Sequence, residues 1–107
     1  MTTTATHREI EPSALSTMLA HGTALLIDVR EPNEFAAGHI KGAINMPLSS
    51  FDPAALPPAD GKLVVLQCAG GKRSGMALDR CAVAGAAITT HLGGGIAAWK
   101  AAGFPTV

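Results

Sequence analysis

The sequence predicts an α/β domain whose mostly parallel sheet is covered by helices on both faces. Two apolar runs, residues 24–29 and 63–67, are nearly continuous, which is typical of strands buried on both faces. Helical patterns, with apolar residues three and four positions apart, alternate with these runs. Strands and helices that alternate along a chain indicate parallel strands joined by helical crossovers.

Composition limits the class of protein. The chain has 107 residues, 48% of them hydrophobic and 15% charged, which fits one globular domain over residues 1–107. Residues 1–9 are polar, and we expect them to form a flexible tail. The formal net charge is zero, so composition gives no general attraction to nucleic acid or to an anionic membrane.

Localisation can also be predicted from the sequence. No apolar run approaches the ~20 residues that span a bilayer, and the N-terminus lacks the apolar core of a signal peptide. Two cysteines do not make a disulfide framework. We therefore expect a cytoplasmic protein with no nucleic-acid or membrane partner, present as a monomer or a weak homodimer.

The individual elements follow from local signals. Proline near a first helical position and glycine after a last one set the helix limits, while short apolar or β-branched runs mark the strands. Strands are expected over residues 24–29, 43–47, 63–67 and 88–92, with a short extended segment from Ile10. Helices are expected between Pro12 and Gly22, over 31–37, over 74–84 and around Ile96 and Trp99, with one or two helical turns between Ser49 and Ala55.

The segment Cys68–Ser74 is the strongest candidate for a functional site. It reads Cys-Ala-Gly-Gly-Lys-Arg-Ser and joins a buried strand to a helix, and ligands of such sheets bind at the carboxyl ends of strands. A thiolate is stabilised by a helix N-terminus and by cations, here Lys72 and Arg73. The small residues after Cys68 allow backbone N–H groups to converge on an anion. The segment thus predicts a reactive thiolate; the alternative is a turn around a core cysteine.

Other motif interpretations fit less well. Gly71-Lys72 resembles the end of a phosphate-binding loop, but Arg73 stands where that loop has Ser or Thr. A strand-to-helix turn explains Gly93-Gly94-Gly95. The four histidines lack metal-ligand spacing, so we expect no metal and no other cofactor. Cys81 would lie ~10 Å along the helix axis from Ser74, and we expect it to be buried and not to act as a resolving cysteine.

Three further stretches of the sequence are distinctive: residues 27–31 (IDVRE), 34–47 (EFAAGHIKGAINMP) and 92–105 (LGGGIAAWKAAGFP). Together they resemble the single-domain rhodaneses, a sulfurtransferase family, within a similarity that runs from Ile10 to Pro105. The Cys68 loop stands where that family keeps its active-site loop. The resemblance implies a rhodanese-like three-layer fold with a five-stranded, mostly parallel sheet.

The resemblance also implies a reaction. Cys68 would accept a sulfane sulfur as a persulfide and hand it to a thiophilic acceptor. Thiosulfate, which releases sulfite, is the usual laboratory donor, and cyanide is the laboratory acceptor. In the cell, a thiol or a protein is the expected acceptor of the sulfur.

Roles can be assigned to the surrounding residues on this basis. Lys72 and Arg73 would hold the sulfonate end of the donor, and Ser74 would cap the helix or bond the sulfur. Arg30, at a neighbouring strand end, is a second candidate for donor binding; alternatively it pairs with Asp28 as structural support, because buried charges are normally paired. The persulfide cradle is expected to consist of Ala69, Gly70, Gly71, Lys72 and Arg73.

Two other functions stay open. Cell-cycle-type cysteine phosphatases and arsenate reductases share the implied fold, but their active-site loop has the pattern Cys-x5-Arg. In this chain only four residues separate Cys68 from Arg73. The shorter loop favours sulfur over a tetrahedral oxyanion as the bound atom. The second alternative is a non-catalytic rhodanese-like module that only binds partners; such modules commonly lack the cysteine that this chain keeps.

Overall fold

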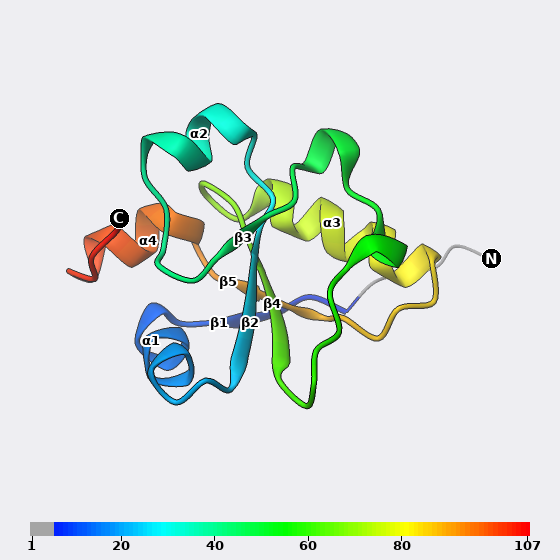
Figure 1. Ribbon diagram of the computed structural model, residues 1–107, viewed down its shortest axis with the longest axis horizontal. Helices are drawn as coiled ribbons and strands as arrows, with labels where there is room; N and C mark the ends of the chain where they lie inside the picture. The colour runs from blue at the N-terminus through cyan, green and yellow to red at the C-terminus, as the bar shows by residue number, and fades with distance from the viewer. Residues whose placement is uncertain (1–5) are drawn as a thin grey trace.

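The computed structural model describes residues 6–107 and contains one five-stranded sheet. All neighbouring strands are parallel, and their order across the sheet is β1-β5-β4-β2-β3 (Figure 1). The expected five-stranded α/β fold is therefore confirmed. The strands are β1 (Arg8–Ile10), β2 (Ala24–Asp28), β3 (Ile44–Asn45), β4 (Leu63–Gln67) and β5 (Thr90–Leu92).

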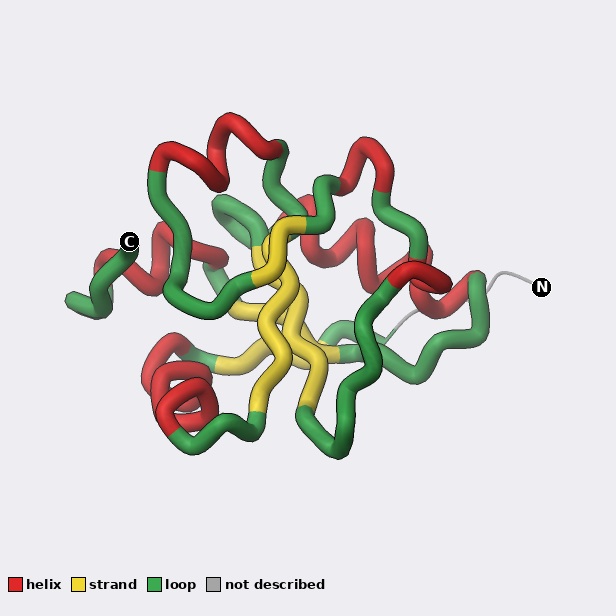
Figure 2. Tube along the Cα trace, viewed as in Figure 1, coloured by secondary structure: helices red, strands yellow, loops and turns green. Residues whose placement is uncertain are grey.

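Helices cover both faces of this sheet, as Figures 1 and 2 show. One core cluster joins the sheet to α1 and α4, and a second cluster joins its other face to α3 and the first 3-10 turn. No helix within residues 6–107 has the length and apolar character needed to cross a membrane. The helices are α1 (Pro12–Ala20), α2 (Pro32–Ala37), α3 (Lys72–Val83) and α4 (Gly95–Ala101), with 3-10 turns η1 (Leu48–Ser50) and η2 (Pro53–Ala55).

The central strands β2 and β4 are apolar up to their last residues, Asp28 and Gln67, because both of their faces are covered. Leu26 and Val65 are register partners and pack on the α1 and α4 face, whereas the next pair, Ile27 and Leu66, packs on the α3 face. Successive side chains of a strand point to opposite faces, so a sheet covered twice needs apolar residues at consecutive positions.

The structure differs from the sequence expectations at several element starts, most clearly at β1 and α3. Arg8 and Glu9 belong to β1, paired with Thr90 and His91, so the flexible tail expected over residues 1–9 is wrong for these two positions. Their polarity concealed the strand, because β1 is a short strand at the edge of the sheet. Residues 1–5 of that expected tail lie outside the described residues. The helix expected from residue 74 begins at Lys72.

This topology brings the sequence-predicted loop to the middle of the sheet. Cys68 directly follows β4, the third of five strands in spatial order. Gly71 is the N-cap of α3, and the N–H group of Ile96, at the start of α4, donates a hydrogen bond to the carbonyl oxygen of Cys68. The carboxyl end of a central parallel strand is thus flanked by the N-termini of two helices.

Candidate functional site

The thiol of Cys68 is enclosed and lies within hydrogen-bond distance of the Gly71 N–H group and the Ser74 hydroxyl group. The residue is 1% exposed, and the N–H group of Gly71 donates to its Sγ at 3.0 Å. The Sγ atom also lies 3.6 Å from the hydroxyl oxygen of Ser74. Gly71 has a φ of 108°, a left-handed conformation that glycine adopts without steric cost. This conformation lets the chain enter α3 with the Gly71 amide turned toward the sulfur.

Opposing effects set the ionisation of this thiol. Burial raises the pKa of Cys68, but hydrogen bonds from the Ser74 side chain and from the N–H groups of Ser74, Gly71 and Gly70 outweigh it. The pKa of Cys68 therefore lies below its ordinary value, and a thiolate is the nucleophilic form of cysteine. The cradle roles of Ala69, Lys72 and Arg73 stay predictions.

The backbone carbonyl groups at the start of the Cys68 loop are hydrogen-bonded to α4. The carbonyl oxygens of Cys68 and Ala69 accept hydrogen bonds from the N–H groups of Ile96 and Ala97, at 2.9 and 3.1 Å. A Cβ atom on Gly95 would lie 2.4 Å from the carbonyl oxygen of Cys68. The glycines 93–95 form the strand-to-helix turn expected from the sequence. The last of them, Gly95, also permits direct contact between the backbone of α4 and the backbone of the Cys68 loop.

The two cations of the loop have different surroundings. The guanidinium of Arg73 donates to both carboxylate oxygens of Glu34 on α2, at 2.6 and 2.9 Å. This hydrogen bond is the main reason that the pKa of Glu34 falls to about 2. Lys72, the first residue of α3, has an exposed side chain. The side chain of Arg73 is therefore fixed by an ion pair, while the side chain of Lys72 is exposed to solvent.

Arg30 and Asp28 form a buried pair behind the site. Nε and Nη2 of Arg30 donate to the carboxylate of Asp28, the shortest contact being 2.8 Å. Nη2 of Arg30 also donates to the carbonyl oxygen of Gly38 at 2.8 Å. These contacts match the structural alternative weighed for the pair. Because Arg30 is also only 6% exposed, unlike Arg73, we no longer assign it to donor binding.

Two further residues complete the description of the site. Cys81 is buried within the α3 core, as expected, and burial raises the pKa of its thiol. His91 was not singled out from the sequence, yet its Nδ1 lies 2.7 Å from the Oγ of Ser74. No local pattern could identify this contact, because it depends on β5 lying beside β4 under the first turn of α3.

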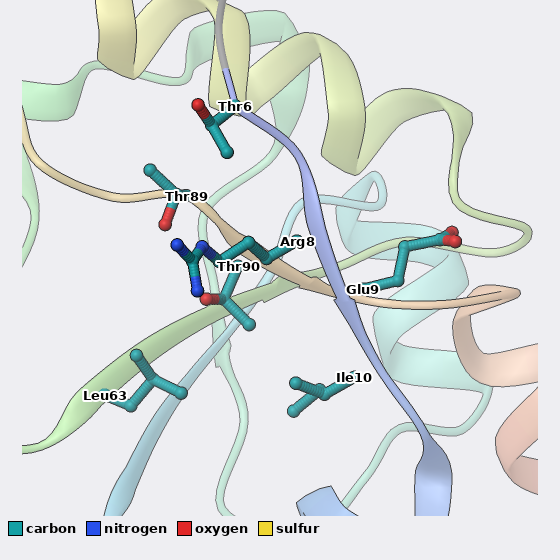
Figure 3. Close-up of a pocket in the computed structure, with 7 residues that line it drawn as sticks. All are labelled: Thr6, Arg8, Glu9, Ile10, Leu63, Thr89 and Thr90. Atoms are coloured by element: carbon teal, nitrogen blue, oxygen red, sulfur yellow. The ribbon is translucent and has the colours of Figure 1, made fainter.

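A separate hollow beside β1 does not belong to this site (Figure 3). Its residues come from β1 and from the amino ends of β4 and β5, whereas Cys68 follows the carboxyl end of β4. Figure 3 shows the side chain of Glu9 turned away from those of Arg8 and Ile10. The hollow is lined by Thr6, Arg8, Glu9, Ile10, Leu63, Thr89 and Thr90.

Comparisons with known proteins identify the family. Residues 11–102 match the model of the Rhodanese-like domain, so this chain belongs to the rhodanese-like domain family and the predicted family is confirmed. A solved structure of a rhodanese-related protein from Thermoplasma volcanium superposes with a TM-score of 0.79 at 31% identity, covering 94% of this chain and 98% of that one.

Two curated relatives are similar over most of the chain. A protein named sulfurtransferase, from Allochromatium vinosum, is 34% identical over 100 residues, which are 92% of this chain and 94% of the relative. An uncharacterised protein of Synechocystis is 45% identical over 104 residues, which are 97% of this chain and 58% of the relative. The chain therefore spans little more than half the length of the Synechocystis protein.

The contact between Gly95 and the loop can be tested by adding a methyl group. We expect Gly95→Ala to lower the free energy of unfolding by ~1–3 kcal/mol more than Gly103→Ala, because its Cβ would overlap the Cys68 carbonyl group. Gly103 is the matched control, since it also has a positive φ but a methyl group there would meet no atom within 4 Å. Urea denaturation measures both variants. Equal losses would contradict the assigned contact.

The Glu34–Arg73 pair predicts a dependence of stability on pH. The pKa of Glu34 is depressed in the folded protein, from 4.5 to about 2, so its stabilisation is full above pH 4.5 and disappears as pH falls through 2. The two side chains are 32% and 30% exposed, so we expect Glu34→Gln to cost ~0.2–1 kcal/mol at neutral pH. Urea denaturation across this pH range should show the cost shrinking in acid. An equal loss of stability at every pH, or the same pH profile for the exposed Glu11→Gln control, would argue against a stabilising Glu34–Arg73 pair.

Proposed function

We propose that this protein is a sulfurtransferase in which Cys68 carries a sulfane sulfur from thiosulfate, or from a persulfide donor, to a thiophilic acceptor. The observation that carries the proposal is the Cys68 thiol itself, which has a lowered pKa and accepts the Gly71 N–H at 3.0 Å. Membership of the rhodanese-like family and the sulfurtransferase relative support it.

In the first half-reaction, the Cys68 thiolate attacks the outer sulfur of thiosulfate. A sulfur–sulfur bond forms at Cys68, the bond within thiosulfate breaks, and sulfite leaves with the electron pair. The negative charge of the new persulfide is centred on its outer sulfur, one bond beyond Sγ, and we assign the N–H groups around Cys68 to stabilise it. Lys72 and Arg73 are the cations assigned to the sulfonate end, Lys72 by its exposure and Arg73 by its place in the loop.

In the second half-reaction, an acceptor attacks the outer sulfur of the persulfide. The bond to the Sγ atom breaks, and Cys68 leaves as the thiolate with which the cycle began. Cyanide would yield thiocyanate, and a thiolate would yield a new persulfide. A low-molecular-weight thiol or a protein cysteine is the proposed cellular acceptor, and a reducing cytoplasm is the proposed location, because both cysteines are free. The proposal includes no metal or other cofactor.

Two alternatives are distinguished by their chemistry. A phosphatase or arsenate reductase would need room for a tetrahedral oxyanion, whereas only four residues separate Cys68 from Arg73. A non-catalytic binding module would have no use for a thiol with a lowered pKa. Both observations favour the sulfurtransferase.

Mass spectrometry after thiosulfate treatment tests the persulfide directly. We expect a gain of one sulfur atom on the wild-type protein and on Cys81→Ser, and no gain on Cys68→Ser, because Cys68 alone has the hydrogen-bonded thiol. A folded wild-type protein without the adduct would favour the binding module. Hydrolysis of an aryl phosphate that disappears in Cys68→Ala would instead favour the phosphatase.

Donor binding by Lys72 can be tested kinetically. We expect Lys72→Gln to raise KM for thiosulfate about 2- to 5-fold, because one exposed charge contributes up to ~1 kcal/mol to anion binding. The effect should shrink at high ionic strength. Lys62→Gln is the matched control, since Lys62 precedes β4 at the opposite end of the sheet. The same change in KM for both variants would exclude a local role for Lys72.

A further inference from the structure

We infer that His91 is the proton acceptor for Cys68 and that it acts through the hydroxyl group of Ser74. The Oγ of Ser74 lies 3.6 Å from the Cys68 Sγ and 2.7 Å from the His91 Nδ1. This inference deepens the proposed function and rests on it, since sulfur transfer requires the Cys68 thiolate. His91 is thus assigned as a positioning residue that controls the thiol through its neighbour.

Three separate elements build this contact. Cys68 follows β4, Ser74 lies in the first turn of α3, and His91 belongs to β5, where it is the register partner of Leu66 on β4. The neighbouring Leu92 packs into the α1 and α4 core, so His91 lies on the α3 face of the sheet. The arrangement is therefore fixed by the sheet register and is not a chance approach of two surface side chains.

Burial makes a local proton acceptor necessary. The exposed fractions of Cys68, Ser74 and His91 are 1%, 0% and 5%. A thiol enclosed to this extent has little contact with bulk water that could take its proton. The Ser74 hydroxyl can accept one hydrogen bond while it donates another, so it can join the two titratable groups.

The proposed step conserves charge and protons. The Cys68 S–H bond breaks and its proton moves to the Ser74 oxygen, while the hydroxyl proton of Ser74 moves to Nδ1 of His91. The products are a thiolate and an imidazolium. Both hydrogen bonds then reverse direction, so that Nδ1–H donates to Ser74 and the Ser74 hydroxyl donates to the sulfur. Before this step, His91 must be neutral with an unprotonated Nδ1. Burial lowers the pKa of His91 and keeps the ring neutral, while the Glu9 carboxylate acts in the opposite direction and favours the imidazolium that forms.

The competing hydrogen bond of Ser74 is to the backbone. The Ser74 Oγ also lies 3.1 Å from the carbonyl oxygen of Gly71. If the Ser74 hydroxyl group donates to this carbonyl oxygen, it serves only to stabilise the first turn of α3. The 2.7 Å contact to His91 exists in both arrangements, and the tautomer of His91 sets its direction. Only the relay makes the ionisation of Cys68 depend on an imidazole, so the titrations below distinguish the two.

Charged groups on two neighbouring segments surround the imidazole. Oε2 of Glu9, on β1, lies 3.9 Å from Nε2 of His91 and raises the His91 pKa, so it can balance an imidazolium. The ring of His7, which precedes β1, packs edge-on at 5.7 Å and lowers that pKa. Nε2 of His7 is in turn bonded to Asp79 of α3 at 2.9 Å. Figure 3 shows Glu9 on the side of β1 opposite to Arg8, in keeping with its contact to His91.

A thiolate titration provides the first test. In a Cys81→Ser background, the ultraviolet absorbance of the thiolate reports the pKa of Cys68 alone. We expect His91→Asn to raise that pKa by about one unit, a tenfold loss of thiolate at a fixed pH below it, because asparagine can accept from Ser74 but cannot take a proton. His21→Asn, at the end of α1, is the matched control and should leave the pKa unchanged. Equal Cys68 pKa values in the two variants would overturn the inference.

The reciprocal titration provides the second test and does not depend on the stability of His91→Asn. Coupling between two groups is mutual, so Cys68→Ser should lower the pKa of His91 by a comparable amount in an NMR titration. An unchanged His91 pKa would overturn the relay. Neither titration uses a sulfur donor, so a coupled pair in a protein that forms no persulfide would reject the proposed function and keep the relay.

Discussion

The rest of the site depends on how the backbone of the Cys68 loop is turned. A loop whose N–H groups point to a central sulfur has carbonyl groups that point outward, and buried carbonyl groups need donors. Here the donors are the N–H groups of Ile96 and Ala97, which a helix leaves without partners in its first turn. That arrangement demands contact between two main chains, and Gly95 allows it. The anion cradle and the start of α4 therefore satisfy each other's hydrogen bonds.

Two ion pairs support this loop at different depths, and α2 joins them. The backbone carbonyl of Glu34 accepts from Arg30 at 3.4 Å, while its side chain accepts from Arg73 at 2.6 Å. Arg30 is itself bound to Asp28, which is fully buried. Burial makes the Asp28–Arg30 pair sensitive to loss of either partner, whereas the partly exposed Glu34–Arg73 pair contributes less energy but orients a residue of the loop. Through Glu34, the short helix α2 thus links the Arg73 side chain of the loop to the buried Asp28–Arg30 pair at the end of β2.

The sequence was informative where structure is local. Continuous apolar runs identified β2 and β4, and the run of glycine and cations after β4 identified the Cys68 loop at a strand end. The start of the edge strand β1 was missed because Arg8 and Glu9 carry no burial signal; of that strand only Ile10 fell in an expected extended segment. The partnership of Arg73 with Glu34, the approach of Gly95, and the contact of His91 with Ser74 were also missed. Each depends on elements distant in the chain, and spacing along a sequence cannot predict which of them become neighbours.

The near-complete enclosure of Cys68 has a consequence for the proposed sulfur transfer. Its exposed fraction is 1%, so the Sγ atom is shielded from oxidants and from bulky reagents. In the proposed cycle, bonding a second sulfur to Sγ would lengthen the side chain by one bond, ~2 Å. The transferred atom would then lie farther from the backbone than the atom that holds it. An acceptor, even one as large as a folded protein, would have to reach only that outer atom and not the buried Sγ.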